Sequence, residues 1–377
     1  MDYFSLSLPK QDLAQYEQTK RYFIKKHVLE ALQMALEKPT HAAPILQKYF
    51  RRTRALGSKD RRRVSDIVYT IIRCSDMFVF LGYENSNQWF SFYQNLVRGD
   101  SIPYDENRNS SDFFSICTGI PKKQCKSIYN RFPDSRSDFI LWTHQQPPTY
   151  IRTCLDKINR KSLQQELFEH DIITKIIPQV PTALQIQGRA NVRAHPLYKK
   201  GYFEIQDLSS QQFCFHFDVK KKRVFDVCSG AGGKSLAFAS QGASVFAHDI
   251  RSYALKELQK RARRGNYQIQ QKIPNHPDII VIDAPCSGIG RIAREPTLRW
   301  KFKHWDPLSF VSIQKELIQR YKNALVSKEQ ILVYATCSLL DEENEHHISG
   351  LQRIETNTNW PHKNLGDGFY WATYKRQ

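Results

Sequence analysis

The chain has 377 residues, of which 41% are hydrophobic and 25% charged, so it can build packed cores in two or three domains and is not disordered throughout. Its 56 Lys or Arg against 37 Asp or Glu give a net charge of +19, which predicts a polyanionic partner, nucleic acid before an acidic membrane. No apolar run approaches the roughly 20 residues of a transmembrane helix, the first residues carry no signal-peptide pattern, and the eight cysteines include no CxxC pair, so we expect a cytoplasmic protein without a zinc ribbon or disulfide staples.

The basic charge is concentrated near the front of the chain. Residues 20–73 hold 14 Lys or Arg against 4 Asp or Glu, a net charge of +10. Apolar residues recur at the helical period over 28–36 and again over 64–72. For any single Lys or Arg, solvation of a helix face is the simpler explanation. Cations at this density repel one another unless a polyanion neutralises them, so we predict a basic, mostly helical RNA-binding domain over residues 1–144.

The middle of the chain has weaker patterns. Residues 82–145 are aromatic and polar without a clear period, and residues 100–112 have the composition of a loop. Pro147-Pro148 marks a boundary. After it a strand, a helix and a second strand are expected at 149–155, 162–170 and 172–177. These elements predict a small α+β (RRM-like) subdomain over residues 145–200.

From residue 203 onward, apolar runs alternate regularly with amphipathic helices. The predicted strands are 224–227, 243–247, 279–282 and 331–334. The predicted helices are 234–240, 252–264 and 307–325. This alternation predicts a doubly wound, Rossmann-like α/β domain over residues 201–377, with a parallel sheet at its centre.

A glycine-rich loop joins the first of these strands to a helix. It reads DVCSGAGGKS over 226–235, and glycines there let backbone N–H groups approach a ligand at the helix N-terminus. A P-loop needs glycine where Cys228 stands, and the GxGxxG spacing is absent, which argues against nucleoside triphosphate and nicotinamide ligands. The next strand ends in Asp249, an acid placed to bind ribose hydroxyls. Unless the glycines only form a tight turn, S-adenosylmethionine is the expected cofactor.

Two cysteines follow the last two of these strands. One strand ends in DAPCSGIGR (283–291) and the other in YATCS (334–338). The carboxyl ends of strands line the ligand crevice of an open α/β sheet, so Asp283, Cys286 and Cys337 should converge beside the glycine loop. A cysteine is often a small core residue, but turns flanked by glycine and serine are poor core positions. We therefore predict that this pair carries chemistry.

These motifs resemble those of the Sun-type (RsmB-like, Nol/Nop/Sun) RNA cytosine-5 methyltransferases. DAPCSG at 283–288 and TCS at 336–338 match that family without change, and CSGAGGK at 228–234 stands where the family has roughly CAAPGGK. Further matches are GSKDRR at 57–62, QDLSSQ at 206–211, ENE at 343–345 and DGFYWA at 367–372. The third strand departs from the family, because residues 265–277 lack the acid that usually helps to hold adenine.

The resemblance implies transfer of a methyl group from S-adenosylmethionine to carbon 5 of a cytosine in RNA, through a covalent adduct between cysteine and carbon 6. It implies that Cys337 is the nucleophile and Cys286 the cysteine that assists release, whereas the residues alone leave open which cysteine attacks. Asp283 can hold the proton on cytosine N3. The implied cofactor-binding residues are Cys228, Ser229, Gly230, Ala231, Gly232, Gly233 and Lys234, with Asp249 and Asp283.

The RNA must bring a single-stranded, looped or flipped-out cytosine to the crevice, since a stacked base cannot reach it. Arg291 and Arg294 follow the first cysteine motif and are placed to grip phosphates. Trp300, His304 and Trp305 are candidates for stacking on bases, although Trp300 is equally suited to a core. Ribosomal RNA is the favoured substrate and transfer RNA the second.

Three alternatives bear on this prediction. Families that methylate uracil carbon 5 or DNA cytosine arrange their motifs differently, and the order of the two cysteine motifs argues against both. A non-catalytic RNA-binding or ribosome-assembly factor on a degenerate methyltransferase fold is kept open by the altered 229–231 loop and the short third strand. The intact cysteine pair argues against such decay. We expect a monomer that binds RNA, without membrane contact or a metal.

Overall fold

The computed structural model describes residues 22–37, 42–98, 110–304, 306–345, 350–363 and 366–377. Trp305 and most of the predicted loop 100–112 lie outside these residues. The chain forms two compact units, here called the helical unit (Met1–Pro147 with Arg291–Pro307) and the α/β unit (Pro148–Gly290 with Leu308–Gln377). Residues 291–307, which the sequence pattern groups with the C-terminal domain, therefore pack within the helical unit. No helix among the described residues is long and apolar enough to span a membrane.

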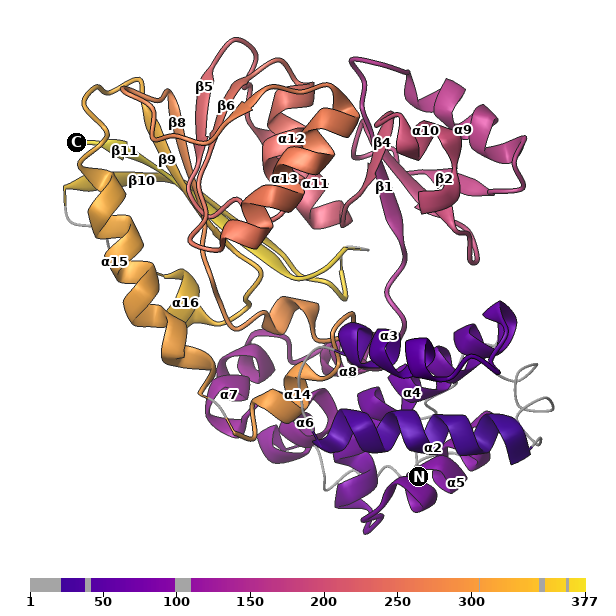
Figure 1. Ribbon diagram of the computed structural model, residues 1–377. Coiled ribbons are helices and arrows are strands. Elements are labelled where there is room, and N and C mark those ends of the chain that lie inside the picture. The colour runs from indigo at the N-terminus through magenta and orange to yellow at the C-terminus, as the bar shows by residue number, and fades with distance from the viewer. Residues whose placement is uncertain (1–21, 38–41, 99–109, 305, 346–349, 364–365) are drawn as a thin grey trace. The chain divides into compact units, whose positions relative to one another are not determined.

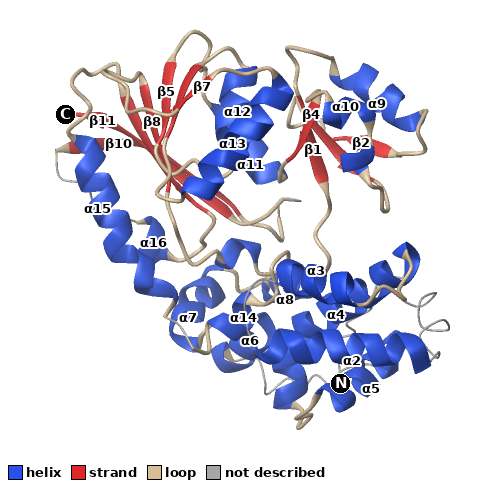
Figure 2. Ribbon diagram, viewed as in Figure 1, coloured by secondary structure: helices blue, strands red, loops and turns tan. Residues whose placement is uncertain are grey.

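The helical unit contains helices alone among its described elements (Figures 1 and 2). They are α2 (Tyr22–Glu37), α3 (Ala42–Arg52), α4 (Ser58–Phe80), α5 (Ser86–Arg98), α6 (Ser111–Thr118), α7 (Lys122–Arg131), α8 (Arg136–His144) and α14 (Leu298–Lys301). The periodic positions Val28 and Leu32 of α2 and Val64 and Ile67 of α4 are fully buried, and α2 to α5 share one core. Helices α5 to α8 occupy the region that showed no clear period.

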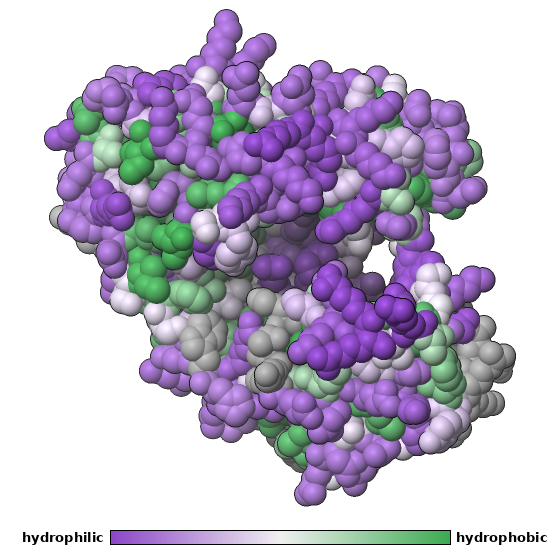
Figure 3. All heavy atoms as spheres, in the orientation of Figure 1, coloured by the Kyte–Doolittle hydropathy of each residue, from purple (hydrophilic) through white to green (hydrophobic). Residues whose placement is uncertain are grey.

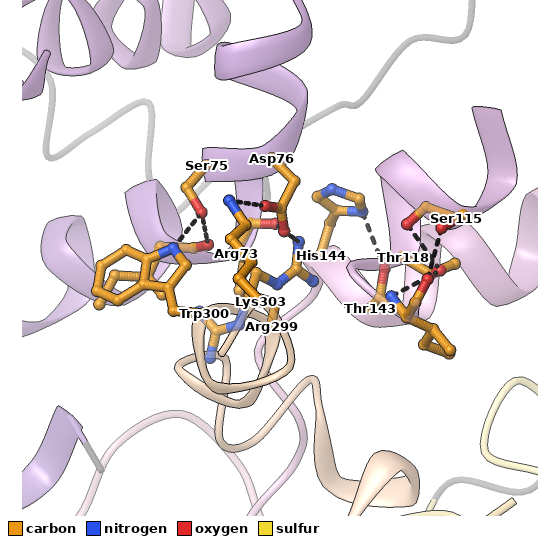
Figure 4. Close-up of polar contacts among 12 residues, drawn as sticks. Arg73, Ser75, Asp76, Ser115, Thr118, Thr143, His144, Arg299, Trp300 and Lys303 are labelled. Atoms are coloured by element: carbon orange, nitrogen blue, oxygen red, sulfur yellow. Dashed lines mark hydrogen bonds and ion pairs between the residues drawn. The ribbon is translucent and has the colours of Figure 1, made fainter. Parts of the chain in front are cut away.

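Residues 291–307 are anchored in this unit by buried polar contacts (Figure 4). Arg73 Nε donates to the carbonyl of Ala293 at 2.9 Å. Trp300 Nε1 donates to Ser75 Oγ at 2.7 Å, and the tryptophan is only 5% exposed within the α2–α5 core. Trp300 is therefore a core residue, which settles the choice that its sequence left between core and base stacking.

A buried ion cluster joins the same segment to α4. Arg299 is buried, donates to the carbonyl of Arg73 and lies 3.7 Å from the carboxylate of Asp76. Asp76 also pairs with Lys303 at 2.7 Å, as Figure 4 shows. Gly119 makes room for this cluster, since a Cβ at that position would lie 2.5 Å from the Arg299 Cβ. Burial lowers the pKa of Arg299 although the charge of Asp76 opposes this.

The α/β unit begins with a small antiparallel sheet in the order β2-β3-β1-β4. Its strands are β1 (Tyr150–Thr153), β2 (Thr174–Ile176), β3 (Ala183–Ile186) and β4 (Phe203–Ile205), with helices α9 (Arg160–Phe168) and α10 (Pro196–Lys199). The predicted strand, helix and strand correspond to β1, α9 and β2. Strands β3 and β4 are additions that the composition did not indicate.

The large sheet has seven strands in the order β10-β11-β9-β8-β5-β6-β7. They are β5 (Arg223–Asp226), β6 (Ser244–Ala247), β7 (Ile269–Gln270), β8 (Ile279–Asp283), β9 (Ile331–Thr336), β10 (Leu351–Asn359) and β11 (Phe369–Arg376). The first five are parallel, and β11 and β10 add an antiparallel edge. The helices are α11 (Leu208–His216), α12 (Gly233–Ser240), α13 (Ser252–Gly265), α15 (Val311–Lys322) and α16 (Asp341–Asn344).

Alternate residues of β5, β6, β8, β9 and β11 build two cores, one on each face of the large sheet. Val224 packs in the core with α11, α12 and α13, whereas Phe225 packs in the core with α15. Figure 1 shows these helices on opposite sides of the sheet. The predicted doubly wound α/β fold is therefore confirmed. The β10–β11 edge was not predicted, because β10 (LQRIETNTN) is mostly polar and lacks the apolar run of a buried strand.

Candidate active site

The glycine loop between β5 and α12 has a backbone that side chains would obstruct. Gly230 and Gly232 have φ angles of 53° and 81°, in the left-handed region that favours glycine. A Cβ on Gly232 would lie 2.6 Å from Leu258 Cγ, so the loop lies directly on α13. Gly233, the first residue of α12, has open space where its Cβ would stand. A ligand can therefore approach the backbone at the N-terminus of α12, where N–H groups lack intrahelical acceptors.

The loop is tied to the end of β6. Ser229 donates from both its N–H and its Oγ to the carbonyl of His248, at 2.9 and 3.1 Å. The Gly230 N–H donates to Asp249 Oδ2 at 2.8 Å. Burial raises the pKa of the Cys228 thiol to about 12, so that side chain is a neutral wall of the loop. The loop and Asp249 thus form one connected structure, as the prediction of a shared ligand requires.

Asp249 is held ready as an anion. Its side chain is 2% exposed and accepts from the Arg251 backbone N–H, Nε and Nη2, each at 2.9 Å. Burial alone would raise the pKa of Asp249, but the hydrogen bonds from Arg251 and Gly230 lower it. The Arg251 side chain is half exposed, so it can move into solvent when other donors bind the carboxylate. Ile250, between these two residues, is 93% exposed and offers an apolar surface beside the carboxylate.

Lys234 and Asp283 form an ion pair between α12 and the end of β8. Lys234 Nζ lies 2.6 Å from Asp283 Oδ2 and 4.9 Å from the centre of the Phe369 ring. Burial alone would lower the pKa of Lys234, but the charge of Asp283 raises it. The carboxylate at the end of β8 thus has a fixed cation beside it and remains partly accessible.

Cys286 and Cys337 are neighbours at the carboxyl ends of β8 and β9. Their sulfur atoms are 3.2 Å apart, close enough for one thiol to donate to the other. The parallel pairing of β8 with β9 sets Asp283 opposite Ala335, two residues before Cys337. The hydrogen bond with Cys337 and burial raise the pKa of the Cys286 thiol well above its usual range.

A buried glutamate holds the two cysteine turns together. Glu343, on α16, accepts from the Ser287 N–H at 2.8 Å, from Ser287 Oγ at 2.5 Å and from Gln314 Nε2 at 3.1 Å. Ser287 Oγ also lies 3.1 Å from Ser338 Oγ. Burial raises the pKa of Glu343 although the hydrogen bonds from Ser287 oppose this. The residues following each cysteine are therefore fixed to one carboxyl group.

Backbone contacts complete the support of these turns. The Gly290 N–H donates to the carbonyl of Cys337 at 3.0 Å, and the Gly368 N–H donates to the carbonyl of Gly290 at 2.7 Å. A Cβ on Gly290 would lie 2.2 Å from the Gly368 carbonyl oxygen, so both positions require the close approach that glycine allows. Asn344 Nδ2 donates to the Ser338 carbonyl at 3.1 Å. The DGFYWA segment thus braces the cysteine turns.

The structure brings together the predicted residues Cys286, Cys337 and Asp283, and joins Asp283 to the glycine loop through Lys234. Sequence reasoning assigned no task to Glu343, although it noted the ENE match that contains it. It did not single out Gln314, because nothing in the sequence distinguishes this glutamine from the other residues on the buried face of α15. Among the described residues, no group of three or more His, Cys, Asp or Glu is arranged to hold a metal ion.

Comparison with known proteins points to one family. The family model for the 16S rRNA methyltransferases RsmB/F matches residues 218–356. The chain is 30% identical over 275 residues to ribosomal RNA small subunit methyltransferase B of Photorhabdus laumondii, covering 65% of this chain and 63% of the relative. It is 29% identical over 281 residues to the protein of the same name from Escherichia coli, covering 67% and 65%. The chain thus aligns with just under two thirds of the length of these relatives.

Solved structures show the same fold at lower identity. The crystal structure of PH0851 is 18% identical, with a TM-score of 0.73, and the match covers 94% of this chain and 98% of that one. The crystal structure of a methyltransferase homologue from Pyrococcus horikoshii is 20% identical, with a TM-score of 0.60, and covers 70% and 98%. Together with the motifs at 228–234, 283–288 and 336–338, the family model and the curated relatives show that the chain is similar to the Sun-type, RsmB-like methyltransferases, and the solved structures show the same fold.

Proposed function

We propose that this protein transfers a methyl group from S-adenosylmethionine to carbon 5 of a cytosine in RNA, and that ribosomal RNA is its substrate. The observation that carries the proposal is the pair of thiols 3.2 Å apart at the ends of β8 and β9, beside the Asp283–Lys234 ion pair. The relatives named as small-subunit rRNA methyltransferases support the substrate class. We also propose that it acts in the cytoplasm as a monomer.

The glycine loop and the end of β6 fit the cofactor. Residues 228–234 leave open backbone at the start of α12, and Asp249 is an ionised acceptor for ribose hydroxyls once Arg251 yields its place. The exposed Ile250 offers an apolar surface on which adenine can pack. When bound, S-adenosylmethionine supplies an electrophilic methyl group.

Carbon 5 of cytosine is a poor nucleophile, and covalent addition of a cysteine to the base can make it more nucleophilic. We assign the attack to Cys337: its thiolate adds to carbon 6, and carbon 5 then becomes an enamine-like carbon able to take a methyl group. The resemblance to the family supports this order, and the 3.2 Å separation of the two sulfur atoms lets the Cys286 thiol donate to the Cys337 thiolate. Asp283 can hold the proton on cytosine N3 and stabilise the charge that develops during addition.

Release requires the loss of the carbon-5 proton and the departure of Cys337. We assign Cys286 to this step: its thiol passes its own proton to the departing Cys337 sulfur, 3.2 Å away, as it takes up the carbon-5 proton. The bond between Cys337 and carbon 6 then breaks, the carbon 5–carbon 6 double bond is restored, and the thiol is free for another cycle.

The helical unit offers a surface for the RNA backbone. Cations cluster at the end of α3 and the start of α4, and the exposed members are Arg51, Arg52, Arg54, Lys59 and Arg62. Figure 3 shows strongly hydrophilic side chains over α3. Arg61 and Arg63 are partly buried and bind the Leu56 carbonyl and Asp60, respectively. Exposed arginines of this density suit the phosphates of a single-stranded or looped RNA.

Adduct trapping tests the proposal. Cys286→Ala protein is mixed with total cellular RNA and S-adenosylmethionine and run on a denaturing gel. A band of RNA-linked protein is expected, because attack by Cys337 is intact while release is blocked. The matched control, Cys286→Ala/Cys337→Ala, should give no band, and sequencing of the trapped RNA should identify the substrate. Absence of a band, with no methyl transfer by wild-type protein, would instead favour a non-catalytic RNA-binding factor.

A further inference from the structure

We propose that Arg261 is a positioning residue of the glycine loop and that the small sheet holds it in place through Glu204. The inference rests on the proposed cofactor site and deepens it, since it gives the small sheet a task in cofactor binding. Arg261 lies on α13, Glu204 on β4 of the small sheet, and all of these elements belong to the α/β unit. Among the described contacts, Arg261 touches neither the two cysteines nor the ion pair at Asp283.

The contact with the loop is direct. Arg261 Nη1 donates to the carbonyl of Ala231 at 2.7 Å, and its Nη2 donates to Glu204 Oε2 at 3.0 Å. Ala231 stands between Gly230 and Gly232, which both have positive φ, so no regular secondary structure holds its peptide group. The guanidinium is planar and presents its N–H groups in a fixed fork, so one side chain can bridge carboxylate and carbonyl.

Burial of Glu204 makes this bridge rigid. The glutamate side chain is 5% exposed and the arginine side chain 16% exposed, so water competes little for either. Strand β4 pairs with β1, which sets the position of Glu204 within the small sheet. The loop carbonyl is thus connected to a second sheet by two charge-assisted hydrogen bonds.

Arg264 provides a matched control one turn further along α13. It binds the other oxygen of the same Glu204 carboxylate, and its guanidinium carbon lies 4.0 Å from the centre of the Tyr198 ring, on the side of the small sheet. Its side chain is 19% exposed, close to the value for Arg261. The two arginines therefore share carboxylate, helix and burial. Of these two arginines, only Arg261 has a hydrogen bond to the glycine loop among the described contacts.

A loop held in its binding conformation loses less freedom when a ligand binds. We therefore expect Arg261→Ala to weaken the binding of S-adenosylhomocysteine about tenfold, in line with the loss of one charge-assisted hydrogen bond. Glu204 keeps Arg264 as a partner in this variant, so the buried carboxylate is not left alone. Arg261→Lys should recover part of the affinity, because an ammonium can reach one of the two acceptors.

The experiment is isothermal titration of the full chain with S-adenosylhomocysteine, below the melting temperature of every variant. Wild-type, Arg261→Ala, Arg261→Lys and Arg264→Ala proteins are compared, and affinity for RNA is measured in parallel. The expected result is the weakest cofactor binding by Arg261→Ala, intermediate binding by Arg261→Lys and wild-type binding by Arg264→Ala, with RNA affinity unchanged in all four. Equal losses in Arg261→Ala and Arg264→Ala would overturn the inference, as would wild-type affinity in Arg261→Ala. Failure of the wild-type protein to bind would overturn the proposed cofactor site itself.

Discussion

The cysteine turns and the glycine loop lie at the same edge of the large sheet, yet their polar groups are held in different ways. The cysteine turns are fixed to a fully buried carboxyl group, Glu343, by hydrogen bonds from Ser287 and Gln314. The glycine loop depends on Asp249, whose main side-chain partner, Arg251, is half exposed. The polar groups at the cysteine turns thus all have internal partners, whereas the partner of Asp249 at the glycine loop can be exchanged for a ligand.

The difference has a physical basis. Covalent attack needs sulfur atoms placed to a fraction of an ångström, and a misplacement of about 1 Å costs roughly a hundredfold in rate. A cofactor that binds and leaves in every cycle needs acceptors whose internal partners can move away, and the half-exposed Arg251 side chain can turn into solvent while a ligand takes over its hydrogen bonds to Asp249. The predictions below test this contrast, from the largest expected effect to the smallest.

Removing Glu343 should damage the cysteine turns most. In Glu343→Ala, the Ser287 N–H and Oγ lose a buried acceptor and the Gln314 amide keeps only the Pro285 carbonyl, which should cost about 3 kcal/mol of folding free energy and about a hundredfold in methyl transfer. Urea denaturation and a labelled-methyl assay measure the two effects. The neighbouring Glu342→Ala, an exposed site, is the matched control and should resemble wild type. Similar results for the two variants would refute the role of Glu343.

Removing Asp249 should affect cofactor binding and leave the fold nearly unchanged. Asp249→Ala should weaken S-adenosylhomocysteine binding about thirtyfold, because two ribose hydroxyls lose a charged acceptor. Glu257→Ala, on the exposed face of α13, is the control and should bind as wild type does. Titration calorimetry gives the affinities. A large loss of stability in Asp249→Ala with unchanged affinity would reverse the contrast drawn between the two regions.

The comparison extends to the exposed cations of the helical unit, which we propose bind the RNA backbone. Neutralising Arg54, Lys59 and Arg62 to Gln should lower the slope of log affinity against log salt by about 0.7 for each lost contact with single-stranded RNA. Fluorescence anisotropy across a salt series measures the slope. Arg61→Gln/Arg63→Gln should change it less, since the structure ties both side chains internally. An unchanged slope in the triple variant would place the RNA elsewhere.

Asp226, at the end of β5, should make stability depend on pH. Burial raises the pKa of this carboxyl from 3.8 to about 7, and Ser235 Oγ donates to it at 2.5 Å. Between these two pKa values the folded chain binds a proton that the unfolded chain has lost, so stability should fall as pH rises through this range and level off above it. Relative to Asp226→Asn, the decline should be at most about 1.4 kcal/mol per pH unit. Parallel pH profiles of the two proteins would contradict this.

The sequence predicted the elements that follow simple periods. The apolar runs of β5, β6, β8 and β9 and the glycine loop were found because buried parallel strands and tight turns restrict residue choice locally. The sequence pattern grouped residues 291–307 with the C-terminal domain, but they pack in the helical unit. Contacts such as Arg73–Ala293 join positions far apart in the sequence, so a local pattern does not reveal them. The contacts of Glu343 with Ser287 and of Arg261 with Ala231 and Glu204 also join distant positions, and a buried charged residue looks like a surface one in a sequence.

Release of hydrogen from carbon 5 tests the central claim most directly. RNA labelled with tritium at carbon 5 of its cytosines is incubated with the protein and S-adenosylmethionine, and both tritium in water and methyl groups in RNA are measured. Methylation of carbon 5 predicts one tritium released for each methyl group transferred, and neither event with Cys337→Ala. Methyl transfer without release of tritium would contradict the account, because it would place the new methyl group on another atom.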